Sequence, residues 1–395
     1  MTTPEVRRIF KGLVKNPVAP DRLEVYDPGY LVVAGEKIEK LSREDPRSRF
    51  PTAEFIDLGG KVIVPGFIDT HVHLPQFAII GTGGDLLTWL NTYTYPEETR
   101  FVNPQYAAQI SRQFFDEMIA NGTTTAAIYC SVHEEATDIA FSTAQAKGVR
   151  AFIGKVMMDQ NSPPALQESV DESITASLRL FEKWDGAEAG RLRYIFTPRF
   201  AASCSMDLMK RVGRIAQERG AFVQSHLSEN KGEVEWVTRL FREFPSYAAV
   251  YDAARLLNER CIMAHCIHLS PDEISLLSAR RTNIAFCPYS NRNLNSGTMS
   301  YRRLRDAGLN ISLGTDIAGG PSLSMLVQMN EAMNAACITS GEALYLATLG
   351  GARALGISDQ VGNFAPGKDA DFVAVEAESV AEVYVRGRRV YFYYP

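Results

Sequence analysis

The distribution of apolar residues from about residue 66 onward alternates between two patterns. Apolar runs of strand length are followed by longer stretches in which apolar positions recur at helical spacing, as in residues 103–122, 165–184 and 206–220. The strand-like runs number eight and occupy residues 67–73, 123–130, 149–158, 192–200, 221–228, 261–269, 282–290 and 310–316. Eight units in βα order predict an α/β fold with the strand count of a (β/α)8 TIM-type barrel, although an open doubly wound sheet has the same periodicity.

The two ends of the chain follow a different pattern. Short β-branched runs broken by Gly and Pro occupy residues 7–15, 30–41 and 54–66, which is typical of a small antiparallel sheet. The tail from residue 361 returns to this pattern. We therefore predict a small β-sandwich domain built from both chain ends, residues 1–65 and 358–395, beside a barrel of residues 66–357.

Composition and charge narrow the class of protein. The chain has 395 residues, 46% hydrophobic and 22% charged, which suffices for a large core. Its formal net charge is −5 without a long run of one sign, so we expect neither nucleic acid nor membrane as a partner. The six cysteines form no C-x-x-C pair and lie mostly in apolar runs, and the N-terminus resembles neither a signal peptide nor a membrane span. These features predict a cytoplasmic protein with buried, reduced thiols.

Five side chains with metal-binding chemistry occur where strand-like runs end. His71 and His73 form a His-x-His pair, His226 opens the tetrad HLSE, His265 ends the apolar stretch CIMAH, and Asp316 ends the run NISLGTD. The carboxyl ends of barrel strands meet at the face where such barrels build their active sites. Period two points both imidazoles of a His-x-His pair to one side of the strand, although the motif alone also occurs by chance in protein cores.

The donor types define the kind of metal that we expect. His71, His73, His226 and Asp316 together offer three nitrogen ligands and one oxygen ligand to a single ion. Such a set suits Zn²⁺, with Fe²⁺ as a second possibility, because Mg²⁺ and Ca²⁺ prefer oxygen ligands throughout. We predict one metal ion per subunit.

Glu229 is the candidate acid and base beside this metal. It follows His226 by three residues, so that after a turn at the strand end its carboxylate can face a substrate and transfer protons. The alternative is an acidic residue that merely favours the start of the next helix. His265, from the following run, is either a further ligand or a hydrogen-bond partner of the attacking water.

Three other basic side chains fit less well. His133 and His268 have structural or exposed positions as their simpler interpretation. Lys155 could bridge a two-metal centre, but it lies in the middle of the third strand-like run, and Glu229 already supplies the group that a one-metal mechanism needs.

Several motifs along nearly the whole chain resemble the amidohydrolase superfamily. They are PGFIDTHVH, HLSE, MAH, CPYSN, LGTDIAGG, TLGGARALG and VGNFAPGKDADFV. The resemblance implies a metal-dependent barrel hydrolase in which His71, His73, His226 and Asp316 bind one zinc ion. It also implies that Glu229 shuttles protons, that His265 holds the hydrolytic water, and that Asp316 accepts a proton from it.

Three longer stretches, residues 86–101, 196–205 and 224–230, are similar to the guanine-deaminating members of that superfamily. This similarity implies hydrolytic deamination of guanine to xanthine and ammonia, and a homodimer, since barrel enzymes of this kind are often dimers. It implies substrate contacts from Gln76, Arg199, Phe200, His226 and Glu229. An Arg fork and an amide can read a purine edge while an aromatic ring stacks on its face; an ion pair for Arg199 and a core position for Phe200 are the alternatives.

Two positions depart from the pattern of those members. Tyr289, in CPYSN, stands where Asn is common, and Phe286 stands where a polar residue is common, so we expect this loop to shape the pocket differently. The alternative substrates are therefore another guanine-like ring, a pterin or 8-oxoguanine, or the ring of a cytosine or triazine hydrolase. A catalytically silent barrel that serves as a binding protein is a third possibility.

Overall fold

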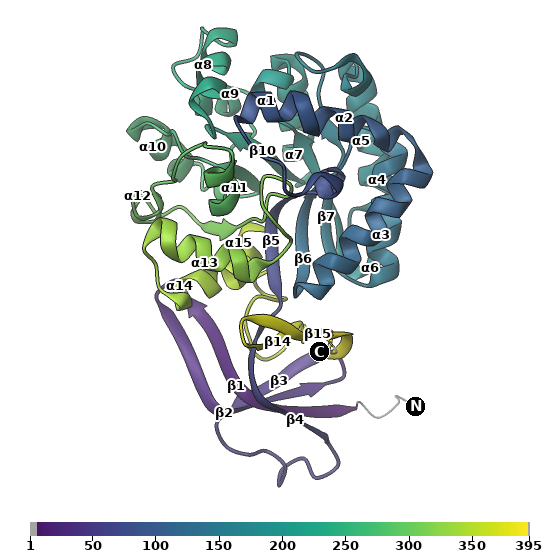
Figure 1. Ribbon diagram of the computed structural model, residues 1–395, viewed down its shortest axis with the longest axis vertical. Helices are drawn as coiled ribbons and strands as arrows, with labels where there is room; N and C mark the ends of the chain where they lie inside the picture. The colour runs from purple at the N-terminus through teal and green to yellow at the C-terminus, as the bar shows by residue number, and fades with distance from the viewer. Residues whose placement is uncertain (1–5, 394–395) are drawn as a thin grey trace.

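A barrel of parallel strands surrounded by helices forms the larger part of the molecule (Figure 1). The computed structural model describes residues 6–393. The barrel strands are hydrogen-bonded in the order β5, β6, β7, β9, β10, β11, β12 and β13, and the short β8 pairs with β9. The strands are β5 (Phe67–His73), β6 (Thr123–Tyr129), β7 (Arg150–Gly154), β8 (Val156–Met157), β9 (Leu192–Pro198), β10 (Phe222–Leu227), β11 (Cys261–His265), β12 (Asn283–Phe286) and β13 (Ile311–Leu313). The predicted (β/α)8 barrel is confirmed, and the open doubly wound sheet is not formed.

Side-chain and loop hydrogen bonds join the first and last barrel strands. The hydroxyl of Thr70 on β5 lies 2.8 Å from the Ser312 hydroxyl and donates to the carbonyl oxygen of Leu313 on β13 at 2.9 Å. Just beyond β13, the backbone N–H of Asp316 donates to the carbonyl oxygen of His71 at 2.9 Å. This closure places Asp316 beside the His-x-His pair, which lies some 245 residues earlier in the sequence.

Helices cover the outside of the barrel, as the amphipathic stretches predicted. The three longest predicted stretches form α3 (Pro104–Ala120), α5 (Val170–Trp184) and α7 (Met206–Arg219), and the side chain of Ser169 caps α5 in a capping box. The other α-helices are α1 (Leu86–Trp89), α2 (Tyr95–Thr99), α4 (Glu134–Lys147), α6 (Ala187–Gly190), α8 (Lys231–Leu240), α9 (Tyr247–Ala253), α10 (Pro271–Ala279), α11 (Pro288–Asn293), α12 (Tyr301–Asp306), α13 (Met325–Ala336), α14 (Ser340–Tyr345) and α15 (Gly351–Ala354).

The second unit is a sheet to which both chain ends contribute, at the lower end of the molecule in Figure 1. Its strands are hydrogen-bonded in the order β16, β15, β14, β4, β1, β2 and β3, all in one path, and β1 pairs with β4 in parallel. An aromatic cluster of Phe10, Phe372 and Tyr384 joins the N-terminal and C-terminal strands in its core. The strands are β1 (Arg7–Ala19), β2 (Arg22–Ala34), β3 (Lys37–Ser42), β4 (Glu54–Pro65), β14 (Phe372–Glu376), β15 (Ser379–Val385) and β16 (Arg388–Phe392). The predicted β unit from both chain ends is confirmed, but its strands form one mixed sheet and not the antiparallel sheet that the sequence predicted.

The chain passes from the sheet into the barrel through a single residue, Gly66, between β4 and β5. A Cβ atom at this position would lie 2.3 Å from the Thr124 hydroxyl oxygen, so only glycine fits the close approach to β6. An ion pair also joins the two units: the buried guanidinium of Arg150 on β7 lies 2.6 Å from the carboxylate of Asp369, just before β14. We propose that residues 66–357 form one unit and that residues 1–65 and 358–395 form the other.

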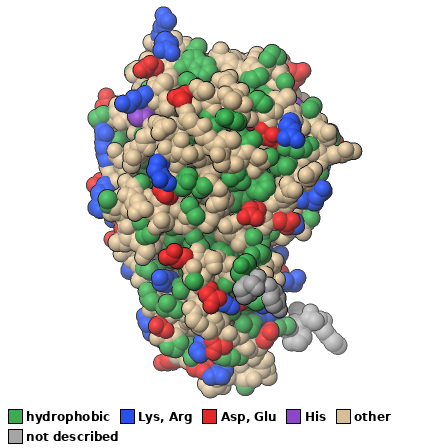
Figure 2. Space-filling model, in the orientation of Figure 1, with side chains coloured by type: hydrophobic (Ala, Val, Ile, Leu, Met, Phe, Trp, Pro, Cys, Tyr) green, Lys and Arg blue, Asp and Glu red, His purple; other side chains and the backbone are tan. Residues whose placement is uncertain are grey.

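Surface and cysteine chemistry agree with the composition. Basic and acidic side chains are interspersed over the face in Figure 2 rather than gathered by sign. Within residues 6–393, no helix is both long and apolar enough to cross a bilayer. All six cysteines are free thiols, and five of them are buried; Cys337, at the end of α13, is exposed.

Candidate active site

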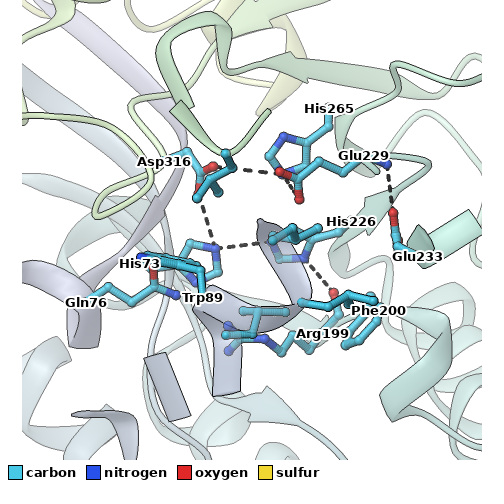
Figure 3. Close-up of a pocket in the computed structure, with 14 residues that line it drawn as sticks. His73, Gln76, Trp89, Arg199, Phe200, His226, Glu229, Glu233, His265 and Asp316 are labelled. Atoms are coloured by element: carbon cyan, nitrogen blue, oxygen red, sulfur yellow. Dashed lines mark hydrogen bonds and ion pairs between the residues drawn. The ribbon is translucent and has the colours of Figure 1, made fainter. Parts of the chain in front are cut away.

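The candidate active site is a pocket at the carboxyl ends of the barrel strands (Figure 3). Its polar side chains come from β5, β10 and β11 and from the segments that follow β5, β9, β10 and β13, and its apolar side chains come mainly from α1 and its surroundings. Its lining residues are His73, Gln76, Leu86, Leu87, Trp89, Leu90, Arg199, Phe200, His226, Glu229, Glu233, His265, Leu294 and Asp316.

The predicted metal donors come together at the floor of this pocket. The Oδ1 atom of Asp316 lies 3.2 Å from Nε2 of His71 and 3.6 Å from Nε2 of His73. The Nε2 atoms of His73 and His226 are 3.2 Å apart. The Nδ1–H of His226 donates to the carbonyl oxygen of Arg199 at 2.6 Å, which directs Nε2 toward the other donors.

The protonation of these imidazoles suits a metal. Burial lowers the pKa of His71 and holds the pKa values of His73 and His226 well below the usual range for histidine, so all three are neutral at pH 7. The buried Nε2 of His71 has no hydrogen-bond partner among the described residues, as expected for an atom reserved for an ion. Groups of donors within 4.8 Å of one another that could hold a metal include His71, His73 and Asp316, and also His71, His226 and His265.

Asp316 lies in the loop after β13 rather than at the strand's last residue, because β13 ends at Leu313. Its φ of 46° is in the left-handed region, which for a non-glycine residue stores strain that often accompanies a functional site. Burial opposes ionisation of Asp316, but its close contact with the His71 imidazole holds the pKa of this carboxyl well below the usual range. The hydroxyl of Ser290 donates to its second carboxylate oxygen at 2.5 Å, leaving Oδ1 to the histidines.

Glu229 and His265 form a pair beside the metal donors. The Oε2 atom of Glu229 lies 3.3 Å from Nε2 of His265, and the Ser296 hydroxyl donates to its other oxygen at 2.9 Å. Burial raises the pKa of Glu229 to about 7, so the side chain can both accept and donate a proton near neutral pH. Burial also works against a charge on His265, but the Glu229 carboxylate raises its pKa, and its Nδ1–H donates to the side-chain oxygen of Asn291.

The helix-start function that could have explained Glu229 belongs to another acid. Helix α8 begins after Asn230, and Glu233 completes the capping box by accepting hydrogen bonds from the backbone N–H groups of Asn230 and Glu229. The carboxylate of Glu229 instead faces the pocket.

Gln76, Arg199 and Phe200 all line the pocket, and Arg199 is also ion-paired. Its Nη1 donates to both carboxylate oxygens of Glu98 on α2, each at 2.8 Å, and both side chains are buried. Phe200 packs edge-on against Trp236 at 5.8 Å between ring centroids. Arg199 therefore forms an ion pair and also lines the pocket. Phe200 likewise packs in the core and also lines the pocket.

Sequence reasoning missed the apolar cover of the pocket. Leu86, Leu87 and Trp89 of α1, Leu90 just after it, and Leu294 lie over the polar floor. The indole N–H of Trp89 donates to the Thr82 hydroxyl at 2.8 Å, which anchors this cover. In the sequence, residues 86–101 carry only a family resemblance, because a helix of four residues such as α1 leaves no periodic hydrophobic pattern.

The expectation that Tyr289 and Phe286 reshape the pocket is wrong, since neither lines it. Tyr289 is half-buried on helix α11, and the guanidinium carbon of Arg292 lies 4.7 Å from its ring centre. Phe286, on β12, is buried in the barrel core.

The remaining basic candidates lie apart from the metal donors. Lys155 is buried and forms an ion pair with Glu168 rather than bridging a metal site. His133 precedes α4, and His268 donates to the carbonyl oxygen of Ser296 at 2.7 Å. His268 thus braces the residue whose hydroxyl contacts Glu229.

A (β/α)8 barrel with imidazole and carboxylate donors at this end defines the class of metal-dependent barrel hydrolases. Comparison with family models agrees: residues 62–390 match the model of the amidohydrolase family. The chain therefore belongs to the amidohydrolase family.

Individual relatives extend over most of the chain. The guanine deaminase of Escherichia coli (strain K12) is 39% identical over 363 residues, 90% of this chain and 82% of that protein. The guanine deaminase of Homo sapiens is 36% identical over 374 residues, 90% of this chain and 82% of that protein. A solved guanine deaminase from C. acetobutylicum, with bound guanine in the active site, superposes with a TM-score of 0.93 at 31% identity, covering 98% of this chain and 100% of that one.

Proposed function

We propose that the protein is an aminohydrolase that converts guanine and water to xanthine and ammonia at a single zinc ion. The observation that carries this proposal is the close approach of the donors, with His73 3.2 Å from His226 and Asp316 within 3.6 Å of His71 and His73, while Glu229 lines the same pocket. The guanine deaminases at 35–41% identity support the choice of substrate.

The metal in this proposal would be held by His71, His73, His226 and Asp316. A bound zinc ion acts as a Lewis acid and lowers the pKa of water toward about 7. Three imidazoles and one carboxylate favour zinc over Mg²⁺ or Ca²⁺, and Fe²⁺ remains the second choice.

Glu229 is the proposed proton carrier. It accepts a proton from water as the water oxygen bonds to the ring carbon that carries the amino group. It then donates a proton to the departing nitrogen as the carbon–nitrogen bond breaks, so the products are xanthine and ammonia. A carboxyl with a pKa of about 7 can take both roles near neutrality. His265, 3.3 Å away, holds the water and the Glu229 carboxylate in place, while the ionised Asp316 provides a second acceptor for the proton of the water.

The rest of the pocket suits a planar, polar ring. Arg199 and Gln76 offer hydrogen bonds to the ring edge, Phe200 with Trp89 offers flat apolar contacts, and His226 and Glu229 approach the reacting carbon. Pterin, 8-oxoguanine, cytosine and triazine rings have no comparable support. The triazine hydrolases among similar structures are only 18% identical and share the fold alone. A silent barrel is disfavoured because every predicted donor is present.

We further propose that the protein acts in the cytoplasm as a homodimer. The five buried free thiols suit a reducing compartment.

Xanthine formation from guanine, measured before and after removal and restoration of zinc, tests the proposed activity. We expect activity to disappear with the metal and to return when one equivalent per chain is added, and activity that persists in the metal-free protein would exclude the proposal.

A further inference from the structure

A buried carboxylate, Glu98 on α2, lies behind the two polar residues that are proposed to read the substrate. Its side chain is 1% exposed and does not line the pocket. Both of its oxygens accept from Nη1 of Arg199 at 2.8 Å, and Oε1 also accepts from Nε2 of Gln76 at 3.2 Å. One carboxylate therefore holds two pocket residues from different segments, Gln76 after β5 and Arg199 after β9.

Glu98 determines which way the amide of Gln76 faces. The Gln76 oxygen accepts from the backbone N–H of Ala318 at 3.1 Å, and the Gln76 nitrogen donates to Glu98. An ionised carboxylate can only accept and a backbone N–H can only donate, so a reversed amide would face an acceptor with its oxygen and a donor with its nitrogen. Only the observed orientation satisfies both ends. One N–H and one lone pair of Gln76 remain for a ligand.

The same carboxylate orients Arg199. Nη1 is committed to Glu98. Within the described residues 6–393, the other N–H groups of this guanidinium donate no hydrogen bond to a protein acceptor. The guanidinium also lies over the Tyr95 ring, with its carbon 5.6 Å from the ring centre. A planar group held on one edge and one face presents its remaining donors in a fixed direction.

We propose that Glu98 is a positioning residue that fixes the donor and acceptor pattern with which Gln76 and Arg199 recognise the substrate ring. The inference rests on the proposed guanine deamination and deepens it by naming the origin of specificity. The pattern is one amide N–H, one amide oxygen and the free guanidinium N–H groups, which matches a ring edge where a carbonyl oxygen stands beside a ring N–H. Glu98 acts through its two partners and does not touch the reacting atoms.

Steady-state kinetics of the zinc-loaded Glu98→Gln variant test this assignment. The substituted amide can donate as well as accept, so only the backbone N–H of Ala318 still favours the orientation of Gln76, and the charge that holds Nη1 of Arg199 is lost. We expect KM for guanine to rise by roughly tenfold to a hundredfold with kcat per bound zinc changed by less than about threefold, because ring binding is impaired while the metal and Glu229 are untouched. Glu98→Asp keeps the charge with a shorter reach and should give an intermediate KM.

The matched control is the neighbouring acid, Glu97, which contacts Arg100 and Tyr106 away from the pocket. Glu97→Gln should leave KM unchanged. A KM for guanine that stays at the wild-type value in both Glu98 variants would overturn the inference, as would a fall in kcat alone. If Glu98→Gln does not fold, the Glu98→Asp result decides. Failure of the wild-type enzyme to deaminate guanine would instead refute the proposed function, so the two failures are distinct.

Discussion

Glu229 and His265 face each other at 3.3 Å, and each is held from behind by a residue of the same short segment after β12. Ser296 donates to Glu229, and Asn291 accepts from His265. The same segment supplies Ser290, which donates to Asp316. One loop therefore provides a separate hydrogen-bond partner to each of three groups that the proposed reaction uses, and a displacement of this loop would disturb all three together.

Replacing Ser296 by Ala should move the acidic limb of the pH profile of kcat/KM. The Ser296 hydroxyl donates to the ionised form of Glu229 and so lowers a pKa that burial has raised to about 7. Without this hydrogen bond the carboxylate is less stable, its pKa rises, and more of Glu229 is protonated at a given pH. We expect the acidic limb to shift to higher pH by about 0.5 to 1 unit, as for a hydrogen bond of roughly 1 kcal/mol.

The exposed hydroxyl of Thr298, two residues further on, provides a control for this experiment. Thr298→Ala should leave the limb where it is. A shift of the limb to lower pH in the Ser296 variant would contradict the hydrogen bond's assigned effect.

Glu229→Gln should abolish most turnover while metal content stays at the wild-type level. The amide keeps the shape of the side chain but cannot accept the proton of the water, and positioned acids and bases contribute roughly 10² to 10⁴ in rate. Turnover by ammonia release and zinc by elemental analysis are the two readouts. A kcat near that of the wild type would mean that another group carries the proton.

Arg199→Leu should lower the free energy of unfolding by more than the loss of the hydrogen bonds of Arg199 alone would cost. It leaves the Glu98 carboxylate buried with only the Gln76 amide as a partner, and an uncompensated buried charge costs about 3 to 5 kcal/mol. Adding Glu98→Gln to the same chain removes that charge, so the double variant should unfold at a higher temperature than Arg199→Leu alone. Additive losses in thermal denaturation would show that the two side chains are not energetically coupled.

The sequence predicted those parts of the site that depend on strand geometry. Period two on β5 directs His71 and His73 to one side, and the order of strand ends placed His226 and His265 at the same face. Glu229 followed from its spacing after His226. What was missed depends on contacts between distant segments: Arg199 and Glu98 are 101 residues apart, and no local pattern pairs them.

Tyr289 illustrates the opposite error. It lies inside a family motif, which predicts a place at the pocket, but it is half-buried on helix α11 and does not line the pocket. The motif places Tyr289 close to site residues along the chain. It does not predict whether the tyrosine side chain lines the pocket.

Metal analysis should find about one zinc ion per chain. The Nζ atom of Lys155 is already ion-paired with Glu168, so the lysine is not free to bridge a second metal. His71→Ala removes one donor and should reduce the zinc retained after dialysis, whereas His133→Ala, outside the donor set, should not. Two ions per chain, or a chemically modified Lys155, would exclude the one-metal site.

The most direct measurement of the central claim is ammonia release by the zinc-loaded enzyme from a panel of guanine, adenine, pterin and cytosine at equal concentration. Adenine carries an amino donor where guanine carries a carbonyl acceptor, so the donors of Arg199 and Gln76 would be left unpaired, and a mismatch of this kind costs several orders of magnitude at a buried polar site. We expect rapid ammonia release from guanine, with xanthine as the other product, and little from the other rings. A zinc-loaded enzyme that ignored guanine and turned over pterin or cytosine would contradict it.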